Sequence, residues 1–383
     1  MNNKSAQSGT GKRPIRILTF TTLFPNAAFP NHGVFVENRL RHLVATGRAT
    51  SRVVAPVGFV PFDSPIFGAH AANARVPRTE TRHGLSIQHP RQLIIPKIGM
   101  LAAPMLLYHA ALPAIRSLQR DEDFDLIDAH YFYPDGIAAT MLGRTLGKPV
   151  VITARGTDVN LIPQFKWPRR MIQKAAGRAA HLIAVSQAIK EAIVALDVPA
   201  EKVTVLRNGV DLVNFRPLDP KACRAKLDLS GKILLSVGLL IERKGHELII
   251  DAMRTLPDFT LLIAGEGPDR PELTRQIAEL GLQTRVRLLG AICHDRLSEF
   301  YSAADALVLA SSREGWPNVL LEAMACGTPV VASNIWGNPE VVAKPEAGRL
   351  MPERSASGVA AGVKEVFANL PDRAATRRYA EMF

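Results

Sequence analysis

Residues 308–333 read VLASSREGWPNVLLEAMACGTPVVAS, and this stretch restricts the possible folds of the chain more than any other. The apolar runs over 306–310 and 328–332 predict two buried parallel strands. Between them, a polar loop over 311–316 leads into a helix from Pro317 to about Cys326, because proline suits a first helical turn. A loop that opens a helix presents unpaired N–H groups and the positive end of the helix dipole. The stretch therefore predicts an α/β domain with an anion site at this loop.

Two glutamates stand in this stretch, Glu314 in the loop and Glu322 in the helix. Eight helical residues span about 12 Å, whereas glycosidases hold two carboxylates about 5 to 9.5 Å apart on a single bond. The wider spacing favours contact with the two ends of one long ligand. The alternative is a solvated glutamate and an unrelated helix-face glutamate. The Gly-Trp-Pro sequence after Glu314 favours the ligand-binding interpretation.

The same residues resemble the signature of the retaining glycosyltransferase family 4, the group 1 glycosyl transferases. The matching residues are Glu314 and Gly315, then Glu322 followed by Ala-Met-Ala-Cys-Gly-Thr-Pro-Val. The resemblance implies an α/β chain of the GT-B fold, with two Rossmann-like parallel-sheet domains facing a central cleft. It also implies that Glu314 contacts the transferred sugar and Glu322 the ribose of the nucleotide.

Charge is distributed unevenly along the 383 residues, whose formal net charge is +12. Residues 1–213 contain 26 Lys and Arg against 14 Asp and Glu, whereas residues 214–383 contain 21 of each. A basic half attracts anionic lipid or a phosphorylated substrate. We do not expect nucleic acid as a partner, because no helix-turn-helix, zinc or aromatic stacking motif accompanies the charge.

Neither a metal nor another cofactor is predicted. The three cysteines, Cys223, Cys293 and Cys326, lack metal-ligand spacing and indicate free thiols in a reducing compartment, hence a cytoplasmic location. The sequence DEDFD at 121–125 contains two Asp-x-Asp patterns, which hold a divalent cation in other transferases. Here they precede a strand, and an acidic surface turn is the better interpretation.

The expected organisation has three parts. Residues 1–14 are polar and basic and predict a disordered leader. The resemblance implies an acceptor-binding domain over residues 15–213 and a nucleotide-sugar-binding domain over residues 214–383, both Rossmann-like. Members of the family usually continue with a helix that crosses back to the first domain, and this helix is expected to be shortened or missing here.

Four residues of the first half match sites of the family. Gly33, at a turn after the first strand, would lie near the donor diphosphate. His130 ends a predicted strand in a His-aromatic-x-x-Pro-Asp-Gly setting and matches the active-site histidine, although a lone histidine is more often structural. Arg155 replaces the histidine that most relatives have before Gly-x-Asp, and its guanidinium could bind a phosphate. Asp158 completes that motif.

Three further segments of the first half are less specific. Residues 58–92 are rich in Pro, Gly, His and Arg and predict an irregular region that could contact the acceptor. Residues 94–115 are apolar but contain three prolines, so we expect a buried or interfacial helix rather than a membrane span. Residues 166–180 predict a basic helix. Arg170 and Lys174 on it indicate either a solvated face or a contact with a membrane surface or an acceptor phosphate.

The second half contains a predicted diphosphate site. Gly238 ends a strand, and Lys244 precedes a helix, which together form a cradle for a diphosphate. Most of the family has an arginine directly after this glycine, where this chain has Leu239. Arg243 is the candidate substitute.

The turn after the next strand, at Gly265, resembles a family turn and lacks the third glycine of an NAD-binding fingerprint. The remaining residues that the resemblance assigns to the donor are Gly290, Ala291, Trp316, Pro317 and Asn318.

The resemblance implies an enzyme, a hexosyltransferase. It would move a hexose-type sugar from a UDP- or GDP-sugar to a lipid-linked or polysaccharide acceptor in cell-surface glycan synthesis. The expected location is the cytoplasm, with peripheral attachment to the inner face of the membrane as a further option. Two alternatives stay open: a nucleotide-sugar 2-epimerase of the same fold and an inactive nucleotide-binding relative.

Overall fold

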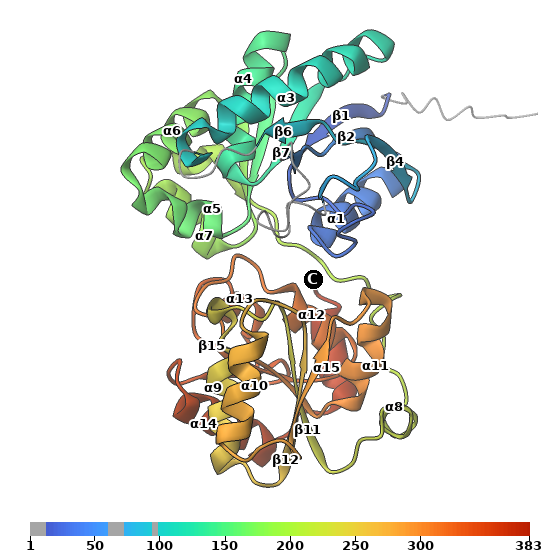
Figure 1. Cartoon of the computed structure of the whole chain (residues 1–383), viewed down its shortest axis with the longest axis vertical. Coiled ribbons are helices and arrows are strands. Elements are labelled where there is room, and N and C mark those ends of the chain that lie inside the picture. Colours follow the sequence, from blue (N-terminus) through green and yellow to red (C-terminus); the bar gives the residue numbers. More distant parts are fainter. Residues whose placement is uncertain (1–12, 60–72, 94–98) are drawn as a thin grey trace, which may run out of the picture. The chain divides into compact units, whose positions relative to one another are not determined.

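The computed structural model describes residues 13–59, 73–93 and 99–383 (Figure 1). The chain forms two compact units. Unit 1 comprises residues 1–153 and 166–182, and unit 2 comprises residues 154–165 and 183–383. The leader expected over 1–14 lies outside the described residues, except for its last two. The domain boundary expected after residue 213 stays a prediction.

Unit 1 is built on a sheet whose strands follow the order β8-β7-β1-β2-β5-β4. Neighbouring strands are parallel, except that β4 is antiparallel to β5. The chain passes from β1 to β2 on one side and returns to β7 on the other side, so the strand order reverses at β1. The strands are β1 Ile15–Phe20, β2 Ala49–Val54, β4 Thr79–Arg82, β5 Leu85–Gln88, β7 Leu126–His130 and β8 Val150–Ala154, with β3 Val57–Phe59 and β6 Arg91–Leu93 forming a separate pair.

The helices of unit 1 fill the connections between these strands. Helices α3, α4 and α6 contact one another (Figure 1). Buried residues such as Leu107, Ala111 and Ile115 on α3 and Ile172 on α6 recur at helical spacing and build the core. The bounds are α1 Val34–Ala45, α3 Gly99–Asp121, η2 Phe132–Gly136, α4 Ile137–Leu146 and α6 Lys166–Arg178.

Two predictions about unit 1 need correction. The irregular region predicted over 58–92 contains β4, β5 and β6 in its described part. These strands have only three or four residues and carry many polar side chains, so they give little apolar signal. The helix predicted to end near residue 115 continues to Asp121 and passes through Pro104 and Pro113. Its buried stripe holds the helix together despite the missing N–H groups. Among the described residues, no helix combines the length and apolar character that crossing a bilayer requires.

Unit 2 contains a six-stranded parallel sheet in the order β13-β12-β11-β14-β15-β16. The four central strands, β11, β12, β14 and β15, are buried on both faces, as their apolar runs predict. The strands predicted at 306–310 and 328–332 are confirmed as β14 and β15, with α12 between them. The bounds are β11 Lys232–Val237, β12 Phe259–Ala264, β13 Val286–Gly290, β14 Ala306–Leu309, β15 Val330–Ser333 and β16 Gly348–Met351.

Helices surround this sheet, and α9, α10 and α14 are among them (Figure 1). The unit also includes β10 Val203–Val205, and β9 His181–Ala184 runs into it from unit 1. The helices are α5 Thr157–Asn160, α7 Gln187–Val194, α8 Pro220–Leu227, α9 His246–Ala252, α10 Arg270–Glu279, α11 Leu297–Ala303, α12 Asn318–Ala325, α13 Asn338–Val341, α14 Ala356–Ala368 and α15 Arg373–Ala380. Short turns of 3-10 or similar helix are η3 Ile162–Gln164, η4 Ala200–Lys202, η5 Glu242–Lys244, η6 Met253–Thr255 and η7 His294–Arg296.

The strand order of unit 2 reverses at β11. The chain goes from β11 to β12 and β13 on one side and then returns to β14 on the other side. In open parallel sheets, ligands bind at the carboxyl ends of the strands where this reversal occurs. The loops that follow β11 and β14 therefore meet at the expected ligand position.

Gly245 joins these two loops. Its φ is +69°, and a Cβ at this position would lie 2.2 Å from the carbonyl oxygen of Ala310, the residue just after β14. Both the left-handed conformation and the close approach require glycine. The contact holds the β11 loop directly against the β14 loop.

His246 follows Gly245 and is almost completely buried. Its Nε2 lies 3.2 Å from the carbonyl oxygen of Leu239 and its Nδ1 lies 3.1 Å from the hydroxyl of Ser236. A carbonyl oxygen only accepts, so Nε2 carries the proton and Nδ1 accepts from Ser236. Burial lowers the pKa of His246 to about 4, so the ring is neutral at pH 7. The neutral ring fixes the start of the β11 loop.

The first prediction concerns Gly245. We expect Gly245→Ala to destabilise unit 2 by at least about 2 kcal/mol more than Gly281→Ala, because of the clash with Ala310. Gly281 is a matched control, since its φ is +64° and a Cβ there would meet nothing within 4 Å. Urea unfolding of both variants measures the difference. Equal destabilisation would show that the two loops are not held by this contact.

The second prediction concerns the pH dependence that His246 causes. Its pKa in the folded chain lies below the ordinary value of 6.5, so the unfolded chain binds the proton more tightly. The resulting stability is complete above about pH 6.5 and is lost as the pH falls towards 4, by roughly 2 to 3 kcal/mol. We expect His246→Gln to flatten this part of the urea-unfolding profile between pH 7.5 and 4.5. Parallel profiles for the variant and the wild-type chain would contradict the assignment.

Candidate functional site

The centre of the site is an ion pair between the two loops at the strand reversal of unit 2. Lys244, at the end of the β11 loop, donates from Nζ to Oε1 of Glu314 in the β14 loop over 2.6 Å. The hydroxyl of Ser311 donates to the same oxygen over 2.7 Å. The structure thus brings together two of the three predicted catalytic residues, which are 70 positions apart in the sequence.

Arg243 also points to this cluster. Its Nη1 donates to the carbonyl oxygen of Arg313 over 2.9 Å and lies 3.9 Å from Oε2 of Glu314. Burial acts to raise the pKa of Glu314, but the charges of Lys244 and Arg243 and the hydrogen bonds from Lys244 and Ser311 outweigh it. The net effect lowers the pKa of Glu314. The carboxylate is therefore ionised at pH 7, and two cations surround it.

Glycines let the backbone of neighbouring loops approach this cluster. A Cβ on Gly238 would lie 3.4 Å from the side chain of Lys244, and a Cβ on Gly265 would lie 1.8 Å from the carbonyl oxygen of Gly238. The N–H of Gly265 in turn donates to the carbonyl oxygen of Gly290 over 2.8 Å. Three of the predicted donor-binding glycines thus form a continuous row along the carboxyl ends of β11, β12 and β13. Ala291 follows directly after this row.

Leu239 occupies the position where the family usually has an arginine. Its side chain is 60% exposed. The position is open to solvent, so a cation there is not excluded by packing. In this chain the positive charge of the β11 loop comes from Arg243 and Lys244 instead.

Glu322, on α12, is held by partners that the sequence analysis did not identify. The hydroxyl of Tyr301 donates to Oε2 over 2.9 Å, and Nε2 of His294 lies 3.3 Å from Oε1. The burial of His294 acts to lower its pKa, but the hydrogen bond and charge of Glu322 dominate and raise it. Tyr301 is fully buried, which keeps its hydroxyl protonated as a donor. Nothing in the local sequence around residues 294 and 301 indicates these contacts.

Trp316, Asn318 and Arg155 are connected through Asn208. The indole N–H of Trp316 donates to the carbonyl oxygen of Asn208 over 3.0 Å. The side chain of Asn208 accepts from Nη1 of Arg155 and donates to Oδ1 of Asn318, both over 3.2 Å. Asn208 belongs to an Asn-Gly-Val-Asp turn, and this turn was the only sequence signal for its role.

Arg155 and Asp158 lie in a turn that packs against the loop of Glu314. The buried carboxylate of Asp158 accepts from the N–H groups of Arg155 and Gly156. A Cβ on Gly315 would lie 1.7 Å from the carbonyl oxygen of Arg155, so only glycine fits there. This turn supports the backbone of Gly315 immediately before Trp316 and Pro317, which lead into α12.

The N-terminus of α7 is capped by a carboxylate from α13, the short helix that follows β15. Glu340 accepts from the N–H groups of Gln187 and Ala188, both over 3.0 Å. Arg207 donates to the same carboxylate over 2.7 Å, and its guanidinium lies 5.7 Å from the ring centroid of Trp316. Negative charge at a helix N-terminus is stabilising. Glu340 thereby connects α13 to the surroundings of Trp316.

His130 and Gly33 belong to unit 1. His130 ends β7 beside the strand reversal of that unit, and its Nε2 lies 3.2 Å from Oδ2 of Asp128. Its carbonyl oxygen accepts from the hydroxyl of Thr21. Gly33 has a φ of +72°, and a Cβ there would lie 2.4 Å from the backbone of Leu23. Both residues thus lie near carboxyl ends of parallel strands, where an active-site residue of such a sheet is expected.

The predicted basic helix is confirmed as α6, and Arg170 and Lys174 are exposed on it. The guanidinium of Arg170 lies 5.4 Å from the ring centroid of the exposed Trp167. The assignment of Arg170 and Lys174 to an acceptor or a phosphate stays a prediction.

The arrangement in unit 2 can bind an extended anion. It offers a lysine and an arginine at the end of one loop, backbone N–H groups before a helix, and two carboxylates that can accept from hydroxyl groups. In the described part of the chain, no three His, Cys, Asp or Glu side chains are grouped so that they could hold a metal ion.

Comparison with known proteins identifies the family of the chain. The family model described as Glycosyltransferase Family 4 matches residues 70–214, and the model described as Glycosyl transferases group 1 matches residues 223–383. TuaC of Bacillus subtilis (strain 168), assigned to teichuronic acid biosynthesis as a glycosyltransferase, is 28% identical over 341 residues, which cover 84% of this chain and 82% of TuaC. The chain spans 40 to 64% of the length of four other relatives.

Solved structures share the fold. Sucrose-phosphate synthase from Thermosynechococcus elongatus superposes with a TM-score of 0.77 at 21% identity, covering 96% of this chain and 92% of that protein. Anabaena Alr3699/HepE in complex with UDP and glucose gives a TM-score of 0.73 at 21% identity, with 96% and 94% covered. The two family matches take up most of the length, and the chain belongs to the group 1 glycosyl transferases of glycosyltransferase family 4, with the GT-B fold.

Proposed function

We propose that this glycosyltransferase moves a hexose-type sugar from a UDP- or GDP-sugar to an acceptor, with retention of configuration. The observation that carries the proposal is the convergence of Lys244 and Arg243 on Glu314, beside the loop that opens α12. Complexes of Alr3699/HepE with UDP and with UDP-glucose support a nucleotide-sugar donor, because that protein has the same fold.

The two cations would stabilise the leaving group. When the bond between the anomeric carbon and the phosphate oxygen breaks, negative charge grows on the diphosphate. Lys244, Arg243 and the backbone N–H groups near Gly315 and Trp316 would bind that charge. Lys244 would then exchange its contact with Glu314 for one with the donor phosphates. The carboxylate of Glu314 would be released to accept hydrogen bonds from sugar hydroxyl groups. Glu322 would accept from the ribose hydroxyl groups.

The acceptor hydroxyl would attack the same face of the sugar from which the diphosphate leaves. The departing diphosphate oxygen would take the proton of that hydroxyl, so the reaction needs no separate nucleophile from the protein. His130 would orient the donor sugar. Attack and departure on one face retain the configuration at the anomeric carbon.

The acceptor is proposed to be a lipid-linked or polysaccharide glycan for the cell surface. The excess of basic residues in the first half of the chain favours an acceptor or membrane with negative charge. The assignment of TuaC to teichuronic acid biosynthesis supports the same class of product. Synthesis would take place in the cytoplasm, at the inner face of the membrane.

One observation favours a second candidate, an inactive nucleotide-binding relative. Leu239 leaves the usual arginine position without charge, and its side chain is 60% exposed. Such a protein would bind a nucleotide sugar without consuming it. A 2-epimerase would instead release the nucleotide without any acceptor.

The third prediction identifies the donor. A ligand at a hundred times its Kd stabilises the folded chain by about 2.7 kcal/mol, which raises Tm by about 5 to 10 °C for a domain of this size. We expect this shift from one of the UDP-, GDP- and ADP-sugars in a thermal-shift panel, with a smaller shift from the matching free sugar. The proposal would be wrong if none of these donors changed Tm.

The fourth prediction concerns the charges at the reaction centre. We expect Lys244→Ala and Glu314→Gln each to lower nucleotide release by at least about a hundredfold, since one stabilising group in a water-poor site contributes about 3 to 4 kcal/mol to the transition state. Release is measured with the donor from the panel, with and without a lipid extract as acceptor. The anomeric configuration of the product is read by NMR.

The matched control for these variants is the pair of exposed Lys226 and half-buried Glu299, whose charged atoms lie 2.5 Å apart in the same unit. Lys226→Ala and Glu299→Gln should leave turnover within about twofold, because neither residue contacts Lys244 or Glu314 and an ion pair open to solvent on one side contributes little. Thermal unfolding checks that all four variants are folded. Undiminished turnover in folded Lys244→Ala would contradict the proposed role, whereas donor binding without turnover in the wild-type chain would favour the inactive relative.

A further inference from the structure

Three neighbouring helices of unit 1 carry basic side chains and exclude acidic ones. Helices α3, α4 and α6 contact one another (Figure 1). Apart from Asp121, the last residue of α3, they contain no Asp or Glu. Their eight Lys and Arg residues are Arg116, Arg120, Arg144, Lys166, Arg169, Arg170, Lys174 and Arg178.

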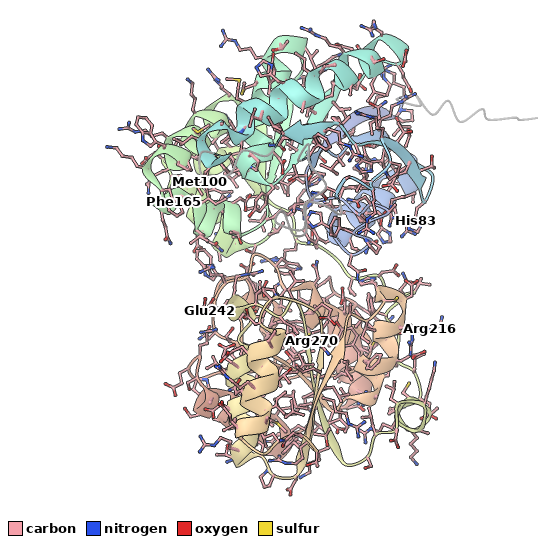
Figure 2. The ribbon with its side chains drawn as sticks, viewed as in Figure 1. His83, Met100, Phe165, Arg216, Glu242 and Arg270 are labelled. Atoms are coloured by element: carbon pink, nitrogen blue, oxygen red, sulfur yellow. The ribbon has the colours of Figure 1, made fainter. Side chains whose placement is uncertain are left out.

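Large apolar side chains are exposed at the beginning of two of these helices. Met100, Leu101 and Met105, in the first two turns of α3, are 49%, 52% and 50% exposed, and Trp167 at the beginning of α6 is 58% exposed (Figure 2 labels Met100). Leu101 and Met105 are four residues apart, so they share one helix face. Contiguous exposed apolar patches mark sites of interaction with proteins, membranes or ligands.

The parallel sheet places these two helix starts at the same edge. Helix α3 leads into β7, and α6 follows β8 and leads into β9. Because β7 and β8 are parallel, both helices run against the strand direction and begin at the carboxyl edge of the sheet. The apolar residues of α3 and Trp167 therefore belong to one end of this helix group, with cations further along α6.

We propose that this region, the α3–α6 surface, binds an anionic phospholipid bilayer. We define it by Met100, Leu101, Met105, Trp167, Arg170 and Lys174. Methionine, leucine and tryptophan side chains would enter the boundary between headgroups and acyl chains, while Arg170 and Lys174 would face the lipid phosphates. The inference rests on the proposed function, because it specifies how the enzyme reaches a lipid-linked acceptor.

The charges around the α3–α6 surface are compatible with this partner. The acidic residues nearest in sequence follow directly after α3, and they are neutralised. Glu122 pairs with Arg52 over 2.8 Å, and Asp123 pairs with Lys148 over 2.7 Å. A soluble polyanion such as nucleic acid would use the cations but would give the exposed Met, Leu and Trp side chains no role.

The test is sedimentation of the full chain with vesicles. We expect binding to phosphatidylcholine vesicles that contain phosphatidylglycerol to be at least about tenfold stronger than to pure phosphatidylcholine vesicles, and to fall with added salt. Arg170→Glu with Lys174→Glu should weaken binding by at least about tenfold, and so should Leu101→Ser with Met105→Ser. All these residues are exposed, so the substitutions should not disturb the core, and circular dichroism is used to check that each variant is folded.

The matched control is Lys364→Glu with Arg378→Glu, which makes the same change in charge on exposed residues of unit 2. It should alter binding less than about twofold. The inference is wrong if the control weakens binding as much as the surface variant, if the wild-type chain does not prefer anionic vesicles, or if the Leu101 and Met105 changes have no effect. The last result would indicate a soluble polyanion.

The failure of this inference can be distinguished from a failure of the proposed function. Donor binding is measured by thermal shift without vesicles, and it depends on residues of unit 2. A chain that binds a nucleotide sugar and ignores anionic vesicles would keep the proposed function and lose the α3–α6 surface. A chain that binds anionic vesicles without binding any donor would support the α3–α6 surface and contradict the proposed function.

Discussion

The ion pair between Lys244 and Glu314 is the interaction on which the arrangement of unit 2 depends. Removing two charges from water is costly, and the mutual attraction compensates only when further hydrogen bonds satisfy both groups. Here Ser311 donates to the carboxylate, and Arg243 adds a second cation. Such a pair contributes little net stability. Its effect is to hold two cations and a carboxylate together where the loops after β11 and β14 meet.

The backbone around this pair is held by contacts that do not involve charge. Gly245 lies against the carbonyl of Ala310, and neutral His246 holds the carbonyl of Leu239. Because the backbone is fixed independently, the cations keep their places when a ligand takes over their charge. Electrostatic stabilisation is most effective when the groups need no rearrangement during the reaction. In the proposed site, the backbone contacts would therefore keep the loops in place while a ligand replaces Glu314 as the partner of Lys244.

The sequence predicted those features that depend on neighbours along the chain. Strands such as Lys232–Val237 are buried on both faces, so they can be recognised in the sequence as apolar runs. Glu314 and Lys244 were identified because each stands in a loop between a strand and a helix and matches a motif of the family. By contrast, Tyr301 and His294 hold Glu322 through tertiary contacts, which no local spacing encodes. The strands within 79–93 were missed because short polar strands lack an apolar period.

The distribution of charge between the two halves has a physical explanation in this fold. The proposed donor site would need a few cations at defined positions, and residues 214–383 contain Arg243 and Lys244 while remaining neutral overall. The excess in the first half cannot have that origin. Exposed helix positions accept Glu as readily as Lys without loss of folding stability, so packing does not explain why α4 and α6 lack acidic residues altogether. An external field of negative charge does explain it, because each acidic residue on such a surface would weaken binding. The proposed membrane contact also explains why the exposed Trp167 lies beside Arg170. An apolar side chain next to a cation suits the boundary between lipid and water.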